Sequence, residues 1–410
     1  MTHRRSLVTA LAAGAVMLAA IPLLAQQKPV SGPVARYDMR AGTVSGMGAM
    51  SGGGMGAALG MMMGRGGNNN AQHELQLRLG STQPPAKGAA KADHFMPPTA
   101  KLGKSVALVT PQEEQDSAER FPSDQRPRGR MLVYWGCGEH APKGQPLVID
   151  FTRLAAGQMP AGMWSSTIIR DWGPTLKNSR TFGRWPAEDG KFAKPDSSLL
   201  GAHRVAGNYL PEISFSLTKD FMAPIRVTAK VQASGSTLVS WGTISEATGY
   251  HATLFGGKQG SDGQMADMVM WSSSASRQFG GGLSDWLSPG QVAPLVRDRT
   301  VLSPATTSCV IPAEVRRDAP DFRLGMLTAF GPQEDFSYPP RPADPKALWK
   351  LDWTARVRHR STASWIDMPG MPSEMRAAEQ SGAQPGLPRL DCRPARGLGG
   401  LLGAVIRPGC

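Results

Sequence analysis

The sequence predicts an all-β protein with two β-sandwich-like domains, flanked by a disordered Gly/Met-rich N-terminal segment and a flexible Gly/Pro-rich C-terminal tail. Short apolar or alternating runs recur between Gly and Pro turns, which is the pattern of strands, and no amphipathic helix of convincing length separates them. The 410 residues include 48 Gly and 34 Pro, which indicates long irregular stretches. Charged residues make up 19% and hydrophobic residues 40%, which excludes both charge-driven disorder of the whole chain and a polytopic membrane protein.

Residues 1–25 have the composition of a secretory signal peptide. Arg4 and Arg5 form a basic region, an apolar run follows, and Ala25 supplies the small residue that precedes a cleavage site. We therefore expect cleavage before Gln26 and an exported protein of the periplasm, the outer envelope or the medium. An uncleaved anchor helix is the alternative interpretation.

The formal net charge is +13 at pH 7. In an exported protein this excess favours contact with anionic envelope surfaces, such as phospholipid headgroups or acidic polysaccharide. Solubility alone would also explain it. We expect an envelope glycan, a membrane surface or a second copy of the chain as partner, and no nucleic acid, because the sequence carries no nucleic-acid recognition motif.

Four cysteines are widely spaced, which fits disulfide bonds in an oxidising compartment better than a metal-ligand set. Cys392 and Cys410 lie in one short tail and are the easiest pair to close. That pairing would leave Cys137 to meet Cys309. Two free, buried thiols are the alternative for this second pair.

Residues 26–70 are predicted to be a Gly/Met-rich segment of low complexity. From 41 to 64 no charged residue occurs, and glycines recur every four residues, at Gly48, Gly52, Gly56, Gly60 and Gly64. On a helix this spacing keeps the glycines near one face, where two backbones approach closely. The stretch resembles glycine-zipper segments of envelope proteins, which implies self-association or membrane contact. Because each Gly costs a helix about 1 kcal/mol relative to Ala, a disordered linker is the favoured interpretation in water.

The methionines of this segment offer a metal-binding interpretation. Met61, Met62 and Met63 are consecutive, and thioethers are soft ligands that suit Cu(I), with His73 as a further donor. Met is also a flexible apolar residue that needs no metal. Copper is therefore an alternative cofactor, and the main expectation is no cofactor.

Residues 71–222 are predicted to form the first β domain. Residues 74–79 alternate polar and apolar side chains with a period of two, and further short runs follow at 105–109, 130–135, 146–151 and 212–217. The charged, Pro-containing stretch 111–130 favours a surface loop.

Aromatic and basic residues interleave near the middle of this domain. Trp164, Trp172 and Trp185, with Arg184, would stack on sugar rings or lie at a membrane interface if they are exposed. The favoured alternative is that these indoles pack a loop onto the core, because Trp is usually largely buried.

The sequence contains no GxSxG, HExxH, P-loop or Ca²⁺-loop pattern. Its nearest approach to a catalytic site is WGCGEH, where Cys137 and His140 are three residues apart. An imidazolium beside a thiol stabilises the thiolate, so a nucleophilic cysteine is one interpretation, and a structural or disulfide-bonded cysteine is the favoured one. We expect a noncatalytic protein, with a hydrolase or transferase acting on envelope glycan as the enzymatic alternative.

Residues 223–367 are predicted to form the second β domain, and within it 224–340 resemble a fibronectin type III module. The segment PIRVTAKVQASGSTLVSWGTISEATGYHATLF is similar to the opening strands of that family, with Trp241 in the second strand and Tyr250 at the start of the third. Residues 307–312 and 322–330 resemble the closing strands. A long insertion at 257–304 and Phe322, where tyrosine is usual, depart from the family. The resemblance implies a binding or spacer module.

Alternation returns strongly at 349–358, which predicts one more strand with Trp349, Leu351, Trp353, Ala355 and Val357 on one face. From 368 to 410 Gly, Pro and Arg recur, which predicts the flexible tail. Taken together, these features predict an exported cell-envelope protein with a binding or structural role.

Overall fold

The computed structural model describes residues 32–47, 71–111, 129–161, 173–187, 192–261, 265–279, 286–344 and 347–368, together with the single residues 163, 165, 169, 171 and 283. Strands predominate over this part of the chain and form three sheets. The prediction of an all-β fold with several sheets is therefore confirmed. No helix among these residues is long and apolar enough to cross a membrane.

The described strands are β1 (Ala35–Gly46), β2 (Gln72–Ser81), β3 (Ala92–Phe95), β4 (Val106–Ala107), β5 (Arg130–Trp135), β6 (Leu147–Asp150), β7 (Thr181–Trp185), β8 (Phe192–Ala193), β9 (Gly201–Gly207), β10 (Ile213–Leu217), β11 (Val227–Val231), β12 (Thr237–Trp241), β13 (Gly249–Gln259), β14 (Met265–Ser272), β15 (Ser308–Ile311), β16 (Phe322–Tyr338) and β17 (Trp353–Asp367). The described α-helices are α2 (Phe151–Ala155), α3 (Pro289–Arg297) and α4 (Ala313–Asp318).

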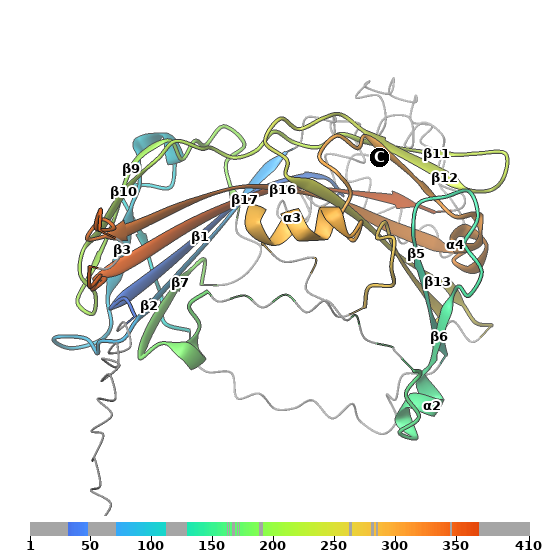
Figure 1. Ribbon diagram of the computed structural model, residues 1–410, viewed down its shortest axis with the longest axis horizontal. Helices are drawn as coiled ribbons and strands as arrows, with labels where there is room; N and C mark the ends of the chain where they lie inside the picture. Colours follow the sequence, from blue (N-terminus) through green and yellow to red (C-terminus); the bar gives the residue numbers. More distant parts are fainter. Residues whose placement is uncertain are drawn as a thin grey trace, which may run out of the picture.

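One sheet of ten strands runs the length of the molecule in the order β6-β5-β14-β13-β16-β17-β1-β2-β7, with β8 also paired to β2. Figure 1 shows the long strands β16 and β17 beside the blue β1 at its centre. The sheet takes strands from both predicted β domains, and β1 comes from the segment predicted as low complexity. The Gly/Met-rich segment is therefore shorter than 26–70. That the two regions fold as separate units stays a prediction.

The alternation at the end of the chain does form a strand, but with shifted bounds. β17 begins at Trp353, just after the Asp352 amide donates to the Tyr338 carbonyl at 2.8 Å and closes the hairpin with β16. Trp349 lies outside the strand, and its indole N–H donates to the Pro339 carbonyl at 3.0 Å. The strand continues nine residues beyond the predicted end at Arg358, because β16 offers a hydrogen-bonding partner along that whole length.

Two smaller sheets cover the same face of the large sheet, which we call the packed face. The four-stranded sheet β10-β9-β3-β4 encloses one core with Tyr37, Met39 and Val357. The three-stranded sheet β11-β12-β15 encloses a second core with Leu327 and Trp365. Val357 and Trp365 are an even number of residues apart on β17, so their side chains point to the same side.

The second core lies between two layers of strands. The strands β11-β12-β15 face β14-β13-β16-β17, and the rings of Trp241 and Tyr250 lie 5.5 Å apart between the layers. The insertion at 257–304 supplies β14 and α3. Fold alone carries no statement about function.

The opposite face of the large sheet, which we call the helix face, holds α3. Val292 and Leu295 of this helix pack with Phe330 of β16, so the helix lies against the middle of the sheet (Figure 1). A Ser288 N-cap forms a capping box with Gln291 at the helix start. The helix therefore divides the helix face into two ends with different chemistry.

Candidate functional site

A pocket of about 380 Å³ opens on the helix face over β5, β14, β13 and β16. Its volume is within the range of roughly 300–1,000 Å³ that is usual for small-molecule sites. The described residues that line it include no Asp, Glu, Lys or Arg. They are mostly apolar, with a few polar groups, and we call it the sheet pocket.

Strand register determines how the lining residues of the sheet pocket are arranged. His251 of β13 pairs with Thr328 of β16. Two residues further along β13, Thr253 pairs with Met326 on one side and Ser272 on the other. The next pairing on this face joins Phe255 to Leu324 and to Met270. Side chains two residues apart share a face, so these three rows lie side by side and change from polar to apolar along the sheet.

Two buried polar atoms of the sheet pocket have no hydrogen-bond partner among the described residues. They are Nε2 of His251 and Oγ of Ser272. His251 is 6% exposed and Ser272 is 5% exposed. An unpaired buried polar group costs about 1–3 kcal/mol, so such groups are rare in folded proteins and call for an explanation. A ligand in the pocket would satisfy both.

Burial lowers the pKa of His251 to about 4. The imidazole is therefore neutral at pH 7, with one ring nitrogen as a donor and the other as an acceptor. The polar end of the sheet pocket is thus uncharged.

The apolar end of the sheet pocket is open to solvent. Phe255 is 39% exposed and Leu324 is 42% exposed, both unusual for large apolar side chains inside strands. The ring of Phe255 lies 6.0 Å from that of Phe322. This end therefore presents a continuous apolar surface.

Two further pockets meet near α4, with cavity volumes of about 240 and 530 Å³. Arg316 and Arg323 line both. Both arginines bond to Asp367, with Nε of Arg323 at 2.9 Å from Oδ2, and Arg323 also donates to the Ala319 carbonyl. These contacts hold the guanidinium groups in place, so we interpret them as structural.

At the other end of the helix face an arginine network joins β1 to β17. Nη2 of Arg358 lies 2.8 Å from Oδ2 of Asp38, and Nε of Arg40 lies 2.9 Å from the same oxygen. Arg40 and Arg356 also contact Asp171. Burial alone would raise the pKa of Asp171, but the neighbouring guanidinium groups lower it. Because the buried arginines Arg40 and Arg358 both have carboxylate partners, the network fastens strands together.

A chain of hydrogen bonds also crosses the first core. The Tyr37 hydroxyl is 2.6 Å from Nδ1 of His94, Nε2 of His94 is 2.9 Å from Nδ1 of His203, and Nε2 of His203 is 2.7 Å from the Leu199 carbonyl. A carbonyl only accepts, so His203 must donate to it through Nε2, His94 must donate to Nδ1 of His203, and Tyr37 must donate to His94. These polar atoms are all paired.

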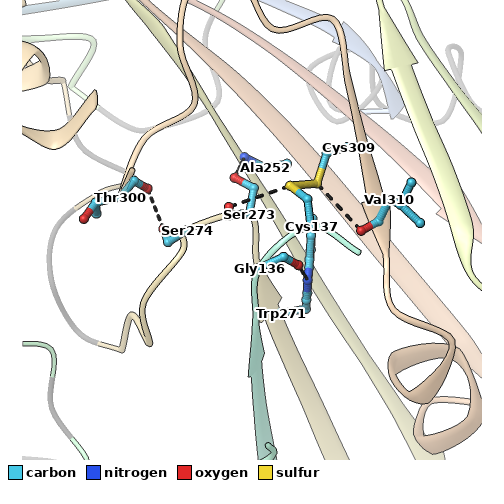
Figure 2. The surroundings of a disulfide bond; sticks show 9 residues. All are labelled: Gly136, Cys137, Ala252, Trp271, Ser273, Ser274, Thr300, Cys309 and Val310. Atoms are coloured by element: carbon cyan, nitrogen blue, oxygen red, sulfur yellow. Dashed lines mark hydrogen bonds between the residues drawn. A yellow bond between two sulfur atoms is a disulfide. The ribbon is translucent and has the colours of Figure 1, made fainter. Parts of the chain in front are cut away.

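Cys137, a candidate nucleophile in the sequence, forms a disulfide bond with Cys309 (Figure 2). This is the pairing that the sequence predicts for these two cysteines. A disulfide sulfur is not a thiolate, so the nucleophilic interpretation of Cys137 does not fit this structure. Near the bond, Trp271 donates through Nε1 to the Gly136 carbonyl at 2.9 Å. The disulfide connects the chain just after β5 to β15, and so ties the large sheet to the three-stranded sheet.

The side chain of His140 contacts α4 and makes no hydrogen bond to Cys137 among the described contacts. Its Nδ1 lies 3.2 Å from Oε1 of Glu314, and the other oxygen of that carboxylate accepts from the Ala141 amide at 2.9 Å. Burial raises the pKa of Glu314, but these hydrogen bonds outweigh it and the net shift is downward. His140 is therefore hydrogen-bonded to α4 at the protein surface.

The proposed binding residues are only partly described. Trp185 is buried in the first core, on β7, so its indole is not available as an exposed platform for sugar. Its neighbour Arg184 donates to the Ala187 carbonyl. Trp164 and Trp172 lie outside the described residues.

Of the residues named in the copper interpretation, His73 is described. Its ring stacks on Phe221 with centroids 3.9 Å apart, and Nδ1 is 3.3 Å from the Thr43 hydroxyl. Among the described residues, no group of three or more His, Cys, Asp or Glu is placed to hold a metal ion. The glycines Gly48, Gly52, Gly56, Gly60 and Gly64, the methionines Met61, Met62 and Met63, and Cys392 and Cys410 lie outside the described residues.

His251, Ser272 and Thr328 were not predicted as site residues from the sequence. They are separated by 21 and 56 residues along the chain, and no local motif marks any of them. The one signal is alternation at 251–255, where His, Thr and Phe occupy one face of a strand.

Comparison of the chain with protein-family models, with curated proteins and with solved structures gave no match.

Proposed function

We propose that this chain is an exported cell-envelope protein that acts by noncatalytic binding, and that the sheet pocket is its binding site. The observation that carries this proposal is the pair of unpartnered polar atoms, Nε2 of His251 and Oγ of Ser272, inside an otherwise apolar cavity. Pockets of this composition, with few polar groups among many apolar ones, are typical of small-molecule sites.

The chemistry of the sheet pocket favours binding over catalysis. A serine nucleophile needs a hydrogen bond to its base and a third group that orients the base. Ser272 and His251 do not bond to each other, and no carboxylate of the described part of the chain lines the pocket. The glycan-hydrolase alternative requires two convergent carboxylates, and the described residues that line each of the three pockets include at most one.

Export is supported by two independent features. Residues 1–25 have the pattern of a signal peptide. The Cys137–Cys309 disulfide joins residues far apart in the chain, and such bonds persist in oxidising compartments. The net charge of +13 supports anionic envelope surfaces as surroundings.

Fractionation of cells that produce the tagged chain tests this proposal. We expect the protein in the envelope or periplasmic fraction, with a mature N-terminus at or near Gln26 and with Cys137 resistant to thiol labelling until reduction. A protein that stays in the cytoplasm with a reactive Cys137 would contradict export.

A further inference from the structure

The sheet pocket is polar at one end and apolar at the other. His251 and Thr328 lie at one end, and Phe255, Leu324 and Met270 lie at the other. The row between them contains Ser272, Thr253 and Met326. A ligand that fills the pocket must therefore carry a polar group at one end and an apolar body at the other. Flexible methionine side chains adapt to bodies of different shape.

The polar end of the sheet pocket disfavours a ligand with a charged head group. No charged side chain among the described residues lines the pocket, so a buried carboxylate or ammonium would have no counter-ion. A neutral imidazole has one donor and one acceptor nitrogen, and the serine hydroxyl both donates and accepts. A ligand hydroxyl, which also both donates and accepts, satisfies His251 in either tautomer, whereas a carboxylate only accepts.

The open apolar end sets no sharp limit on ligand length. Phe255 and Leu324 are each about two-fifths exposed at the mouth. An aliphatic chain longer than the cavity would leave the pocket along this surface and bury it further. The ligand can therefore be longer than a molecule that fits entirely within the cavity of about 380 Å³.

We propose that the sheet pocket binds an uncharged amphiphile with a hydroxyl head, such as a long-chain alcohol, with the hydroxyl at His251 and Ser272 and the apolar body between Phe255 and Leu324. This inference rests on the proposed function, because it names the ligand class of the same site.

The test uses the full exported chain and the neutral fluorescent probe N-phenyl-1-naphthylamine, displaced by 1-decanol, decanoate or decylamine at pH 7.5. We expect 1-decanol to displace the probe, with decanoate and decylamine at least about tenfold weaker, because their charges would be buried without a partner. His251→Leu should weaken decanol about tenfold while leaving the affinity for the apolar probe unchanged or higher.

Two further variants show where the probe binds. Thr253→Trp places an indole in the middle of the pocket and should abolish probe binding. Val148→Trp on β6, an exposed position outside the pocket, is the matched control and should bind the probe like the wild type. Far-UV circular dichroism and the unfolding midpoint of each variant confirm that it folds.

The outcomes separate the two proposals. If the probe binds, and Thr253→Trp abolishes its binding, but decanoate competes as well as decanol, the ligand class is wrong and the binding site stands. If a folded wild-type chain binds neither the probe nor decanol, or if Thr253→Trp binds the probe like the wild type, both the ligand class and the sheet pocket as binding site are wrong.

Discussion

The buried hydrogen-bond chain from Tyr37 to Leu199 shows how single atoms stabilise the first core. Each donor points in the same direction, from the tyrosine hydroxyl through His94 and His203 to a backbone carbonyl. Burial lowers the pKa values of both histidines and raises that of Tyr37, so all three groups are uncharged at neutral pH. The arrangement stabilises one tautomer of each ring.

Removing the first donor should therefore be costly. In Tyr37→Phe, Nδ1 of His94 loses its donor and remains buried, so we expect the free energy of unfolding to fall by about 1–3 kcal/mol. Urea unfolding followed by circular dichroism measures this. Tyr338→Phe is the control, because Tyr338 is exposed and should change stability little. Equal stability of both variants would mean that the hydrogen bond contributes nothing.

Acidification should destabilise the protein through its buried histidines. The pKa values of His94, His203, His251 and His359 are all lowered chiefly by burial, His251 to about 4. The unfolded chain, with histidine pKa values near 6.5, therefore binds more protons below that pH. The histidine contribution to stability is complete above about pH 6.5 and is lost as pH falls toward 4, by up to about 1.4 kcal/mol per pH unit for each histidine.

Urea unfolding at pH 7.5, 5.5 and 4.5 measures this dependence. His251→Leu removes one titrating group without adding a charge, so its stability should fall less steeply with acidification than that of the wild type. A stability that stays level from pH 7.5 to 4.5 would contradict the assignment of neutral, buried histidines.

At the scale of elements, the disulfide is the main covalent link between layers. It joins Cys137, just beyond β5, to Cys309 in β15, across 172 residues of chain. Closing so long a loop restricts the unfolded chain strongly, so its removal should lower the free energy of unfolding by about 2–5 kcal/mol.

Cys137→Ser tests this with little loss of packing, because Cys137 is exposed whereas Cys309 is buried. The unfolding midpoint of the variant is compared with that of the wild type before and after reduction. We expect the reduced wild type to match the variant. A variant as stable as the oxidised wild type would show that the bond is energetically neutral.

Several strands could be predicted because their residues alternate or form short apolar runs. The stretch 74–79 lies within β2, 130–135 matches β5, and 212–217 includes all of β10 and one residue before it. β1 was missed because its second half, Ala41–Gly46, is small and uncharged and so matched the Gly/Met-rich composition, although Tyr37 and Met39 alternate with Asp38 and Arg40. The first half therefore carried a strand pattern that composition concealed.

The site could not be predicted for a different reason. His251, Ser272 and Thr328 meet only through the register of β13 with β14 and β16, and register depends on pairing between distant segments. Burial of His251 is likewise a property of the assembled sheet. No single window of sequence contains this information.

At the scale of the whole molecule, the large sheet takes strands from both predicted β domains. The first core includes Tyr37 and Met39 from β1 and Ala355 and Val357 from β17, all outside residues 71–222. A fragment of residues 71–222 would leave this core open to water on one side.

We expect that fragment to lack a cooperative thermal transition when it is produced alone. Proton NMR dispersion and circular dichroism measure this, and the full chain provides the comparison. A fragment 71–222 that unfolds cooperatively would support two independent domains and contradict the dependence on β1 and β17.

The parallel pairing of β1 with β17 also affects when the large sheet can form during synthesis of the chain. Asp38 and Arg356, which bond across this pair, are 318 residues apart. At roughly 5–20 residues per second, the ribosome finishes β17 about 15–60 s after it has made β1. Until then β1 has no neighbour on that side, and an unpaired strand edge invites pairing with other chains. The centre of the sheet is therefore the last part to close, and an unfinished chain must be kept from aggregating until its C-terminal strand arrives.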